Sequence, residues 1–377
     1  MAPIKIGFIG LSSSQSWAVW AHLPYLKNTS KYEIVALCNS SVASAEAAIK
    51  THGLPSTVKA YGTYEDLAAD PNVELVVCSI RVDKHYEALL PALKAGKDVF
   101  CEWPLASNAA QAEELLKIAK EKGVKTLVGL QAGMSPTVRK VKELLDGGRV
   151  GRLLSSSFVG AATLVGESGP EALAYTNDDK SGGNLLTIYA MHSLEGITHA
   201  IAPIASFSSH LATVHPVVTL TTATGTPTGA TVPRTAPDQV MLHGTLSNPS
   251  HTIFSYHLRG GPAFSNSPST GLSWTLYGTK ATILITGPNS FLNIADATSS
   301  GFKIEVFEHE SGTTEEVVVD GGEWSSEEKG VPLFGRNVAR LYEAFADGEK
   351  EAVLGWEEAV QRHEFVKSVY EKAGWKR

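Results

Sequence analysis

The first residues able to do chemistry are the glycines and serines of the segment Lys5–Ala18, which reads KIGFIGLSSSQSWA. The apolar run before Gly10 is typical of a strand buried on both faces. Gly7 and Gly10 follow the spacing of a dinucleotide-binding turn, where small residues let backbone N–H groups approach a pyrophosphate. Ser12 and Ser13 add hydroxyls where we expect a helix to begin, and a helix N-terminus favours anions. The third glycine of G-x-G-x-x-G is not in its usual place, so an ordinary strand-to-helix turn is the alternative.

The second predicted strand, residues 32–38, ends in Asn39 and Ser40 instead of a carboxylate. In NAD enzymes an Asp or Glu at this strand end binds the ribose hydroxyls. Small polar residues leave room for a 2′-phosphate. The predicted cofactor is therefore NADP(H) or NAD(H), with NADP(H) favoured. No Arg follows closely, and a plain polar turn is the alternative.

These residues need a sheet that brings several strand ends together. Strands and helices alternate from the N-terminus to residue 130, which is the signature of a doubly wound parallel sheet. Beyond residue 153, alternating segments predict a large, mostly antiparallel open sheet. The predicted fold is α/β, with an NAD(P)-binding Rossmann domain at 1–130 and a C-terminal α/β substrate and oligomerisation domain at 131–377. The Thr-, Gly- and Pro-rich residues 221–237 are typical of a long loop.

Composition excludes several classes of partner. The 377 residues carry a formal charge of −7 and show no basic cluster, which argues against direct binding to nucleic acid. No apolar stretch is long enough to span a membrane, and the first strand begins by Ile4, leaving no room for a signal peptide. Cys38, Cys78 and Cys101 lack metal-ligand spacing, so we predict reduced packing thiols and no metal site. A cytoplasmic location follows, with the nucleus as the alternative for a regulator.

With these elements placed, the chain resembles the glucose–fructose oxidoreductase / inositol dehydrogenase / rhizopine-catabolism (Gfo/Idh/MocA) family. The match rests on the N-terminal turn, on His85 at the head of its helix before Gly96-Lys97-Asp98-Val99, and on Cys101-Glu102-Trp103-Pro104-Leu105. Further segments, such as Leu130-Gln131 and Gly278-Thr279-Lys280, are similar to the fungal branch that contains the galactose-regulon repressor of yeasts. The resemblance spans nearly the whole chain and implies a Rossmann domain followed by an open-sheet α/β domain.

The resemblance also implies which residues contact the cofactor and which do chemistry. The expected cofactor-binding residues are Gly7, Gly10, Leu11, Ser12, Ser13, Trp17, Asn39, Ser40, Ile80, Arg81, His85, Glu102, Trp103 and Gln131. Several have plainer alternatives: capping or hydrogen bonding of a strand for His85, a salt bridge for Glu102, and packing for Trp103, whose indole could also stack on a ring. The Trp103-Pro104 bond is a candidate for the cis form.

Two of the three standard catalytic groups of the family are absent. The family uses the Lys of Glu-Lys-Pro, where this chain has Trp103, and an indole has no useful pKa. It also uses an Asp and a His of a Gly-Gly-x-x-x-Leu-Asp-x-x-x-His segment. Here His192 is kept, while the Asp position holds Ile188, or Thr187 if the register slips by one. His192 is the acid/base candidate. Tyr189, three residues earlier on the same predicted helical face, is a second candidate. Buried packing is the alternative for both.

Three functions compete at this point. The first is an NAD(P)-dependent oxidoreductase that acts on a small, cyclic or sugar-like metabolite with non-standard acid/base residues. The second is a non-catalytic NAD(P)-sensing transcriptional regulator, which like the yeast repressor would cover an activator protein. The third is a degenerate member that has lost the cofactor. We favour the enzyme, with a small-molecule substrate and a homodimer as the expected partners.

Overall fold

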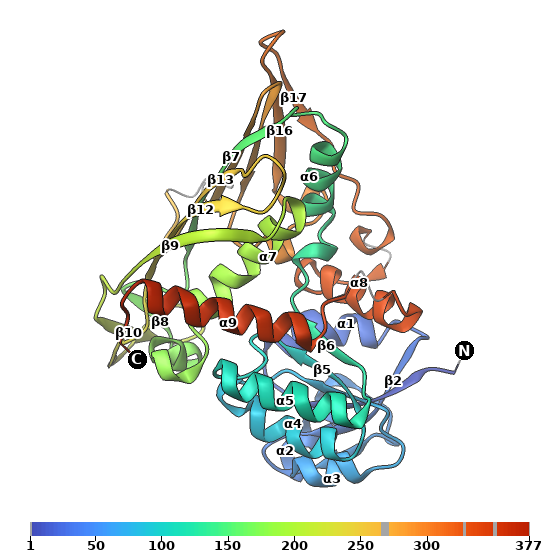
Figure 1. The fold of residues 1–377 in the computed structure, drawn as a ribbon. Coiled ribbons are helices and arrows are strands. Elements are labelled where there is room, and N and C mark those ends of the chain that lie inside the picture. Colours follow the sequence, from blue (N-terminus) through green and yellow to red (C-terminus); the bar gives the residue numbers. More distant parts are fainter. Residues whose placement is uncertain (1, 265–270, 327–328, 350–352, 377) are drawn as a thin grey trace. The chain divides into compact units, whose positions relative to one another are not determined.

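The structure, a computed structural model, describes residues 2–264, 271–326, 329–349 and 353–376. These residues form two compact units, drawn in Figure 1. Unit 1 comprises residues 1–130 and 323–364, and unit 2 comprises residues 131–322 and 365–377. No helix within the described ranges combines the length and the apolarity needed to cross a bilayer.

Unit 1 contains a six-stranded parallel sheet in the order β3-β2-β1-β4-β5-β6. Its strands are β1 (Ile4–Ile9), β2 (Tyr32–Cys38), β3 (Lys59–Tyr61), β4 (Leu75–Cys78), β5 (Asp98–Glu102) and β6 (Thr126–Gly129). Every residue of β4 is buried, as expected for a strand covered on both faces. The order reverses between β1 and β4, and in such sheets ligands bind outside the carboxyl ends of the strands at that point. The predicted Rossmann fold is confirmed.

Helices cover both faces of this sheet. They are η1 (Ala18–His22), α1 (Leu23–Leu26), α2 (Val42–His52), α3 (Tyr64–Ala69), η2 (Val82–Lys84), α4 (His85–Lys94) and α5 (Ala109–Lys122). A Cβ at Gly7 of β1 would lie 2.9 Å from Val73 and 3.2 Å from Leu67 of α3. The next residue, Phe8, meets His22 of η1 at 5.5 Å. Because neighbouring side chains of a strand point to opposite faces, α3 and η1 cover opposite faces.

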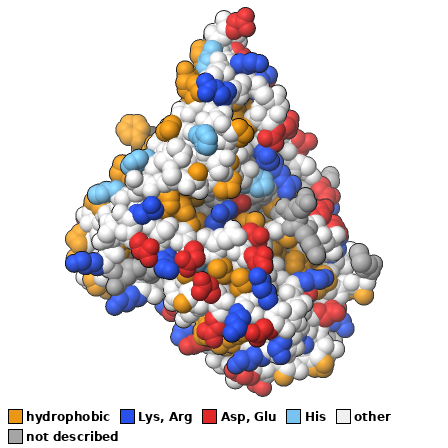
Figure 2. All heavy atoms as spheres, in the orientation of Figure 1, with side chains coloured by type: hydrophobic (Ala, Val, Ile, Leu, Met, Phe, Trp, Pro, Cys, Tyr) orange, Lys and Arg blue, Asp and Glu red, His pale blue; other side chains and the backbone are white. Residues whose placement is uncertain are grey.

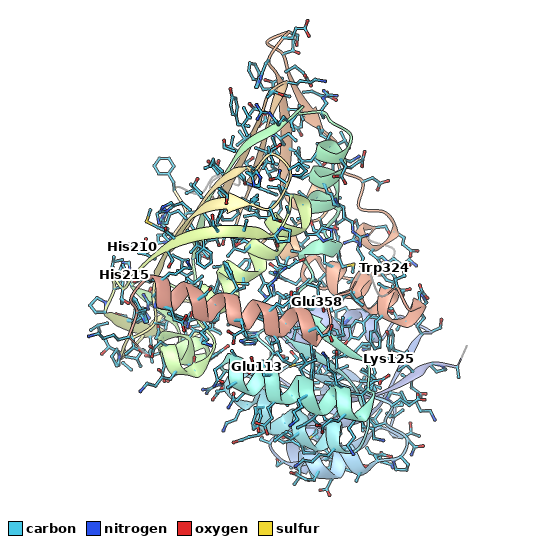
Figure 3. The ribbon with its side chains drawn as sticks, in the orientation of Figure 1. Glu113, Lys125, His210, His215, Trp324 and Glu358 are labelled. Atoms are coloured by element: carbon cyan, nitrogen blue, oxygen red, sulfur yellow. The ribbon has the colours of Figure 1, made fainter. Side chains whose placement is uncertain are left out.

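A late segment of the chain returns to unit 1. It holds η9 (Glu323–Ser325), α8 (Leu333–Asp347) and the first part of α9 (Trp356–Lys372), which runs on into unit 2 after Glu364. Tyr342 of α8 stacks on Tyr25 at 5.3 Å, and Trp356 Nε1 donates to Leu127 O at 3.2 Å. Figure 3 labels Trp324, whose ring meets the Tyr25 ring at 5.3 Å. The sequence pattern places residues 323–364 in the second domain; the packing of their aromatic side chains corrects this.

Unit 2 is built on an eight-stranded sheet in the order β17-β16-β15-β14-β7-β13-β12-β9. Its strands are β7 (Leu153–Ala162), β9 (Ile204–Ala212), β12 (Gln239–Leu246), β13 (Ile253–Gly260), β14 (Leu272–Gly278), β15 (Ala281–Gly287), β16 (Lys303–Glu308) and β17 (Thr314–Val317). Only the pair β13–β7 is parallel among the described strands of this sheet, so the predicted, mostly antiparallel sheet is confirmed.

One face of this sheet packs on helical elements, and the other face carries no helix among the described residues. The helical elements of unit 2 are η3 (Ala132–Met134), α6 (Pro136–Asp146), η4 (Glu171–Asn177), η5 (Asp179–Ser181), η6 (Leu185–Ala190), α7 (Met191–Ala200), η7 (Leu292–Ile294), η8 (Thr298–Ser300) and the end of α9 from Phe365. Ser193 of α7 is hydrogen-bonded to Tyr256 of β13 at 2.7 Å, and Tyr256 stacks on Phe158 of β7 at 4.8 Å. The covered face is therefore an aromatic core tied to α7.

The opposite, outer face of the sheet presents polar and apolar side chains with few charges. One row across the strands runs His210, Met241, His257, Val159 and Ser273. The exposed large apolar residues of this face are Val159, Met241, Ile253, Tyr277 and Phe307. Figure 2 shows hydrophobic and histidine side chains on the surface near β9, β12 and β13.

The segment expected to be a long loop contains a strand instead. β10 (Val217–Thr221) and β11 (Pro227–Pro233) form a hairpin, with β8 (Ser168–Pro170) on the other side of β10. Proline is tolerated on an edge strand because the missing N–H is not needed there, which is why the Pro-rich composition misled the loop prediction.

Candidate functional site

Gly10 makes the turn at the end of β1. Its φ is +97°, and a Cβ there would lie 2.4 Å from both Ser79 O and the Ile80 side chain. Its N–H donates to Cys38 O at 3.1 Å. The turn therefore brings the carboxyl ends of β1, β2 and β4 into direct contact, and only glycine satisfies both the space and the φ angle.

Residues 11–17 form a loop before the first helix, so the expectation that a helix begins at Ser12 or Ser13 is wrong: it begins at Ala18. The Ser12 side chain accepts from Ser14 N at 3.1 Å, which is the local bonding that makes serine favour turns. Two side chains hold the loop. Asn39 Nδ2 donates to Leu11 O at 2.9 Å, and His52 Nε2 lies 2.7 Å from Ser12 O.

Two buried polar atoms of this loop have no hydrogen-bond partner among the described residues: Ser16 Oγ and Trp17 Nε1. Buried polar groups are nearly always paired, so two orphans beside the Gly10 turn indicate a missing polar partner. An indole N–H only donates, and a hydroxyl can donate, so the partner must supply acceptors. Phosphate oxygens meet that requirement, and the loop fits a dinucleotide.

Asn39 and Ser40, at the end of β2, differ in their surroundings. Asn39 Nδ2 also lies 3.3 Å from Ser44 O, so its amide is engaged by the protein. Ser40 is exposed, and Ser41 caps α2 by accepting from Ser44 N at 3.1 Å. Of the two predicted residues, Ser40 is the exposed one, and its Oγ lies 3.5 Å from Ser44 Oγ.

His85 joins the loops that follow β4 and β5. Its Nδ1 lies 2.8 Å from Pro104 O and its Nε2 lies 3.0 Å from Ile80 O. Burial lowers the pKa of His85 below its usual value, although the backbone hydrogen bonds oppose this effect. Arg81 is exposed and bonds Asp83 through Nε at 3.1 Å. His85 therefore holds the backbone of the loops that follow β4 and β5.

Glu102, at the end of β5, is bonded to a histidine that no sequence motif singles out. His22 Nε2 lies 2.8 Å from Glu102 Oε1, and His22 Nδ1 lies 2.9 Å from the Tyr342 hydroxyl. His22 and Tyr342 are completely buried. Burial raises the pKa of Tyr342 well above its usual value, so the phenol stays protonated. The three side chains form a hydrogen-bonded chain from the sheet edge into the core.

Trp103 is the residue that we expect, from the sequence, at the position of the family lysine. It is 4% exposed, its ring lies 4.7 Å from that of His363, and its bond to Pro104 is cis, as considered from the sequence. Ala106 N donates to His363 Nε2 at 3.4 Å, and burial lowers the pKa of His363 to about 3. His363 is thus a neutral acceptor, and neither ring of this pair supplies the ammonium group of the family lysine.

With this geometry established, comparison with known proteins becomes informative. Residues 4–130 match the model of an oxidoreductase family with an NAD-binding Rossmann fold, GFO_IDH_MocA, and residues 136–287 match that of the C-terminal domain of Gal80p. The dehydrogenase aclE of Aspergillus oryzae is 30% identical over 98% of this chain and 96% of its own length. The chain belongs to the Gfo/Idh/MocA family.

The chain is also similar in sequence to a regulatory protein and in fold to a further dehydrogenase. The galactose/lactose metabolism regulatory protein GAL80 of Saccharomyces cerevisiae is 30% identical over 78% of this chain and 69% of its own length. A crystal structure of a super-repressor mutant of that protein superimposes with a TM-score of 0.86 at 25% identity, covering 99% and 97% of the two chains. Levoglucosan dehydrogenase, solved with NADH and levoglucosan, shares the fold at a TM-score of 0.76 and 16% identity.

In unit 2, the segment after Gly182 and Gly183 opens a π-helical turn. Asn184 caps it by accepting from Leu186 N and Thr187 N at 3.0 and 3.1 Å, while the Thr187 hydroxyl accepts from Asn184 N at 2.8 Å. Thr187 is therefore used in the cap. The π-turn spans residues 185–190, and such turns occur frequently at functional sites.

Tyr189 and His192 follow this cap, on η6 and α7 respectively. Both are buried, and the Tyr189 ring packs against Phe291 at 5.1 Å. Burial raises the pKa of Tyr189, so its hydroxyl is a proton donor at neutral pH. The spacing of a regular α-helix would place Tyr189 and His192 on one face, as predicted from the sequence. Tyr189 instead lies in a π-helical turn, which holds more residues per turn than an α-helix.

Gln131, the remaining predicted residue, is fully buried at the start of unit 2. Neither its Oε1 nor its Nε2 has a hydrogen-bond partner among the described residues. Such an amide offers both a donor and an acceptor. Sequence reasoning missed His22 and His52, whose partners lie 80 and 40 residues away in the chain; no local pattern marks either residue.

Proposed function

We propose that this chain is an NAD(P)-dependent oxidoreductase that acts on a small, cyclic or sugar-like metabolite through non-standard acid/base residues. The observation that carries the proposal is the loop after Gly10, where Ser16 Oγ and Trp17 Nε1 are buried without partners among the described residues. The near full-length similarity to the dehydrogenase aclE supports an enzymatic function.

In this proposal the strand ends of unit 1 hold the dinucleotide. Gly10 allows the close backbone approach, Ser16 and Trp17 donate to phosphate oxygens, and Ser40 contacts the ribose end. Gln131 uses its unpaired amide to bind the cofactor. When bound, the nicotinamide ring accepts or delivers a hydride. Because the β2 end lacks a carboxylate that would repel a 2′-phosphate, we favour NADP(H) over NAD(H).

The proton of the reaction must come from a residue other than the missing lysine. We assign this role to His192, because imidazole is the side chain most often used as a general acid or base, with Tyr189 as a second donor. A phenol of raised pKa gives a proton to a carbonyl oxygen during reduction more readily than it removes one from an alcohol. Tyr189 therefore fits the reductive direction, and His192 fits either direction.

A second function is favoured by Trp103. Its buried packing against His363 leaves the lysine position without a proton carrier, and GAL80, a regulatory protein by name, is similar over most of this chain. The alternative is a cofactor-sensing regulator that binds an activator protein, located in the nucleus. The enzyme proposal places the chain in the cytoplasm, where its three free, buried thiols stay reduced.

We also propose that a second copy covers the outer face of the unit 2 sheet. Exposed apolar residues such as Met241 and Ile253 lie there on neighbouring strands, and large exposed apolar patches mark interaction sites. A Met241→Lys, Ile253→Lys variant should sediment as a monomer where the native chain sediments as a dimer. A native chain that is monomeric at micromolar concentration would refute the assignment.

The test of the main proposal uses the purified chain with NADPH or NADH and a panel of sugars, keto sugars and cyclic imines, followed by absorbance at 340 nm. We expect turnover with at least one compound, a lower KM for NADPH than for NADH, and a kcat reduced about 10²–10⁴-fold in His192→Asn. Tyr189→Phe is the matched comparison. Cofactor binding without turnover, together with capture of an activator peptide, would favour the regulator. Failure to bind either cofactor would refute both.

A further inference from the structure

Three soft metal-ligand side chains meet at the carboxyl ends of β4 and β5. Cys78 ends β4 and pairs in register with Cys101 of β5, and His85 is the first residue of α4. Their candidate ligand atoms all lie within 4.8 Å of one another, and all three residues are buried. Sequence spacing did not show this group, because the residues come from two strands and a helix.

Each ring nitrogen of the imidazole in this group faces a backbone carbonyl oxygen. Ile80 O lies 3.0 Å from Nε2 of His85, and Pro104 O lies 2.8 Å from Nδ1. A neutral imidazole has one N–H, so it can donate to only one of these two carbonyl oxygens. When Nε2 donates to Ile80 O, the Nδ1 lone pair faces Pro104 O.

A cysteine sulfur atom also lies close to Nδ1 of His85. Cys101 Sγ lies 3.3 Å from the same Nδ1, and its thiol also lies 3.3 Å from Glu102 O. One ring nitrogen of His85 and the sulfur atoms of Cys78 and Cys101 thus lie within 4.8 Å of one another. Metal-binding histidines commonly donate their other ring N–H to a backbone carbonyl, as His85 Nε2 can do to Ile80 O.

We propose that Cys78, His85 and Cys101 bind one zinc ion. A set of two thiolates and an imidazole binds Zn²⁺ in preference to hard cations, which favour oxygen ligands. On binding, each thiol releases its proton to solvent and forms a Zn–S bond, while the neutral Nδ1 forms a Zn–N bond. The two thiolate charges balance the divalent cation, so the buried site is neutral. Pro104 O is available as a fourth ligand.

The required movement is small. Zn–S and Zn–N bonds of about 2.3 and 2.0 Å place tetrahedral ligands roughly 3.5–3.8 Å apart. The three side chains start within 4.8 Å of one another, so shifts of about 1 Å close the site. This proposal goes beyond the oxidoreductase function and does not rest on it.

The experiment loads the full native chain with Zn²⁺, or with Co²⁺ as a spectroscopic probe, under a phosphine reductant that keeps the thiols reduced. Excess metal is removed by gel filtration. We expect one metal per chain, and with Co²⁺ a thiolate-to-metal charge-transfer band with the visible bands of tetrahedral cobalt. Cys78→Ser and Cys101→Ser should each lose the bound metal. Cys38→Ser is the matched control, since Cys38 is a buried cysteine of the same sheet whose thiol bonds Thr63 O instead.

Two results would overturn the zinc site. One is a folded native chain that retains no metal after loading. The other is metal retention in Cys78→Ser and Cys101→Ser equal to that in Cys38→Ser. If a serine variant does not fold, the Co²⁺ spectrum of the native chain decides, because bound cobalt without a thiolate charge-transfer band would mean that other ligands hold the metal.

Discussion

His22 Nε2 and Glu102 Oε1 lie 2.8 Å apart in the interior of unit 1, joining the first helix after the Gly10 loop to the end of β5. A carboxylate only accepts, so Nε2 carries the proton, and Nδ1 is free to accept from the Tyr342 hydroxyl at 2.9 Å. This pair fixes the carboxylate of the residue that precedes Trp103. It also connects the candidate site to α8, a helix more than 200 residues further along the chain.

Removing one partner of this pair should cost more stability than removing both. In His22→Phe, the Glu102 carboxylate stays buried without its donor, and we expect the free energy of unfolding to fall by about 3 kcal/mol. In the double variant with Glu102→Met, no buried polar group is left unpaired, so part of that loss should be recovered. Urea unfolding of both variants measures the difference. A single variant within about 1 kcal/mol of the native chain would show that the pair contributes little.

Substituting Gly10 should abolish cofactor binding, whereas a comparable glycine elsewhere should not. Gly10→Ala places a Cβ 2.4 Å from Ser79 O at a φ of +97°, so the turn that joins three strand ends must move. Gly53 ends α2 with a φ of +61°, and a Cβ added there would meet no neighbouring atom within 4 Å. Gly53→Ala therefore carries a cost of about 1 kcal/mol without disturbing the loop. Calorimetric titration with NADPH checks both variants; equal affinities would contradict the role given to Gly10.

Trp17→Phe should leave stability nearly unchanged and weaken cofactor binding. The indole N–H has no partner among the described residues, so its removal costs the free protein no hydrogen bond. If that N–H donates to a phosphate in the complex, its loss should raise the dissociation constant about tenfold, as expected for a charge-assisted hydrogen bond. Ser16→Ala should act in the same direction. An unchanged affinity in both variants would show that the orphan donors do not meet the cofactor.

The strand and helix pattern predicted the fold because buried strands, and helices that end at a glycine, can be recognised from short stretches of sequence. Gly10 was also predictable, since its turn needs a small residue within a short motif. The loop before Ala18 was not, because the Ser12 side chain bonds within the loop instead of capping a helix, and Asn39 and His52 hold the loop through Leu11 O and Ser12 O. The packing of Tyr342 in unit 1 could not be predicted either, because the apolar spacing of an amphipathic helix does not show which element the helix packs against. Long-range partners of this kind decide most of the candidate site.

Protonation of Asp70 should make unit 1 less stable as the pH falls below about 4. Burial alone would raise the pKa of this carboxyl, but hydrogen bonds from Asn72 N, Lys59 Nζ and the Tyr61 hydroxyl outweigh it and lower the pKa to about 2. A carboxyl whose pKa is lower in the folded state stabilises that state above its unfolded pKa of about 3.9, and the contribution is lost as pH falls from there towards the folded value. Asp70→Asn should therefore lower the free energy of unfolding by about 2 kcal/mol at neutral pH. The effect should be smaller at a pH of about 2, where the native carboxyl is about half protonated. Urea unfolding of both chains across this pH range measures the gap, and a gap that does not change with pH would contradict the lowered pKa.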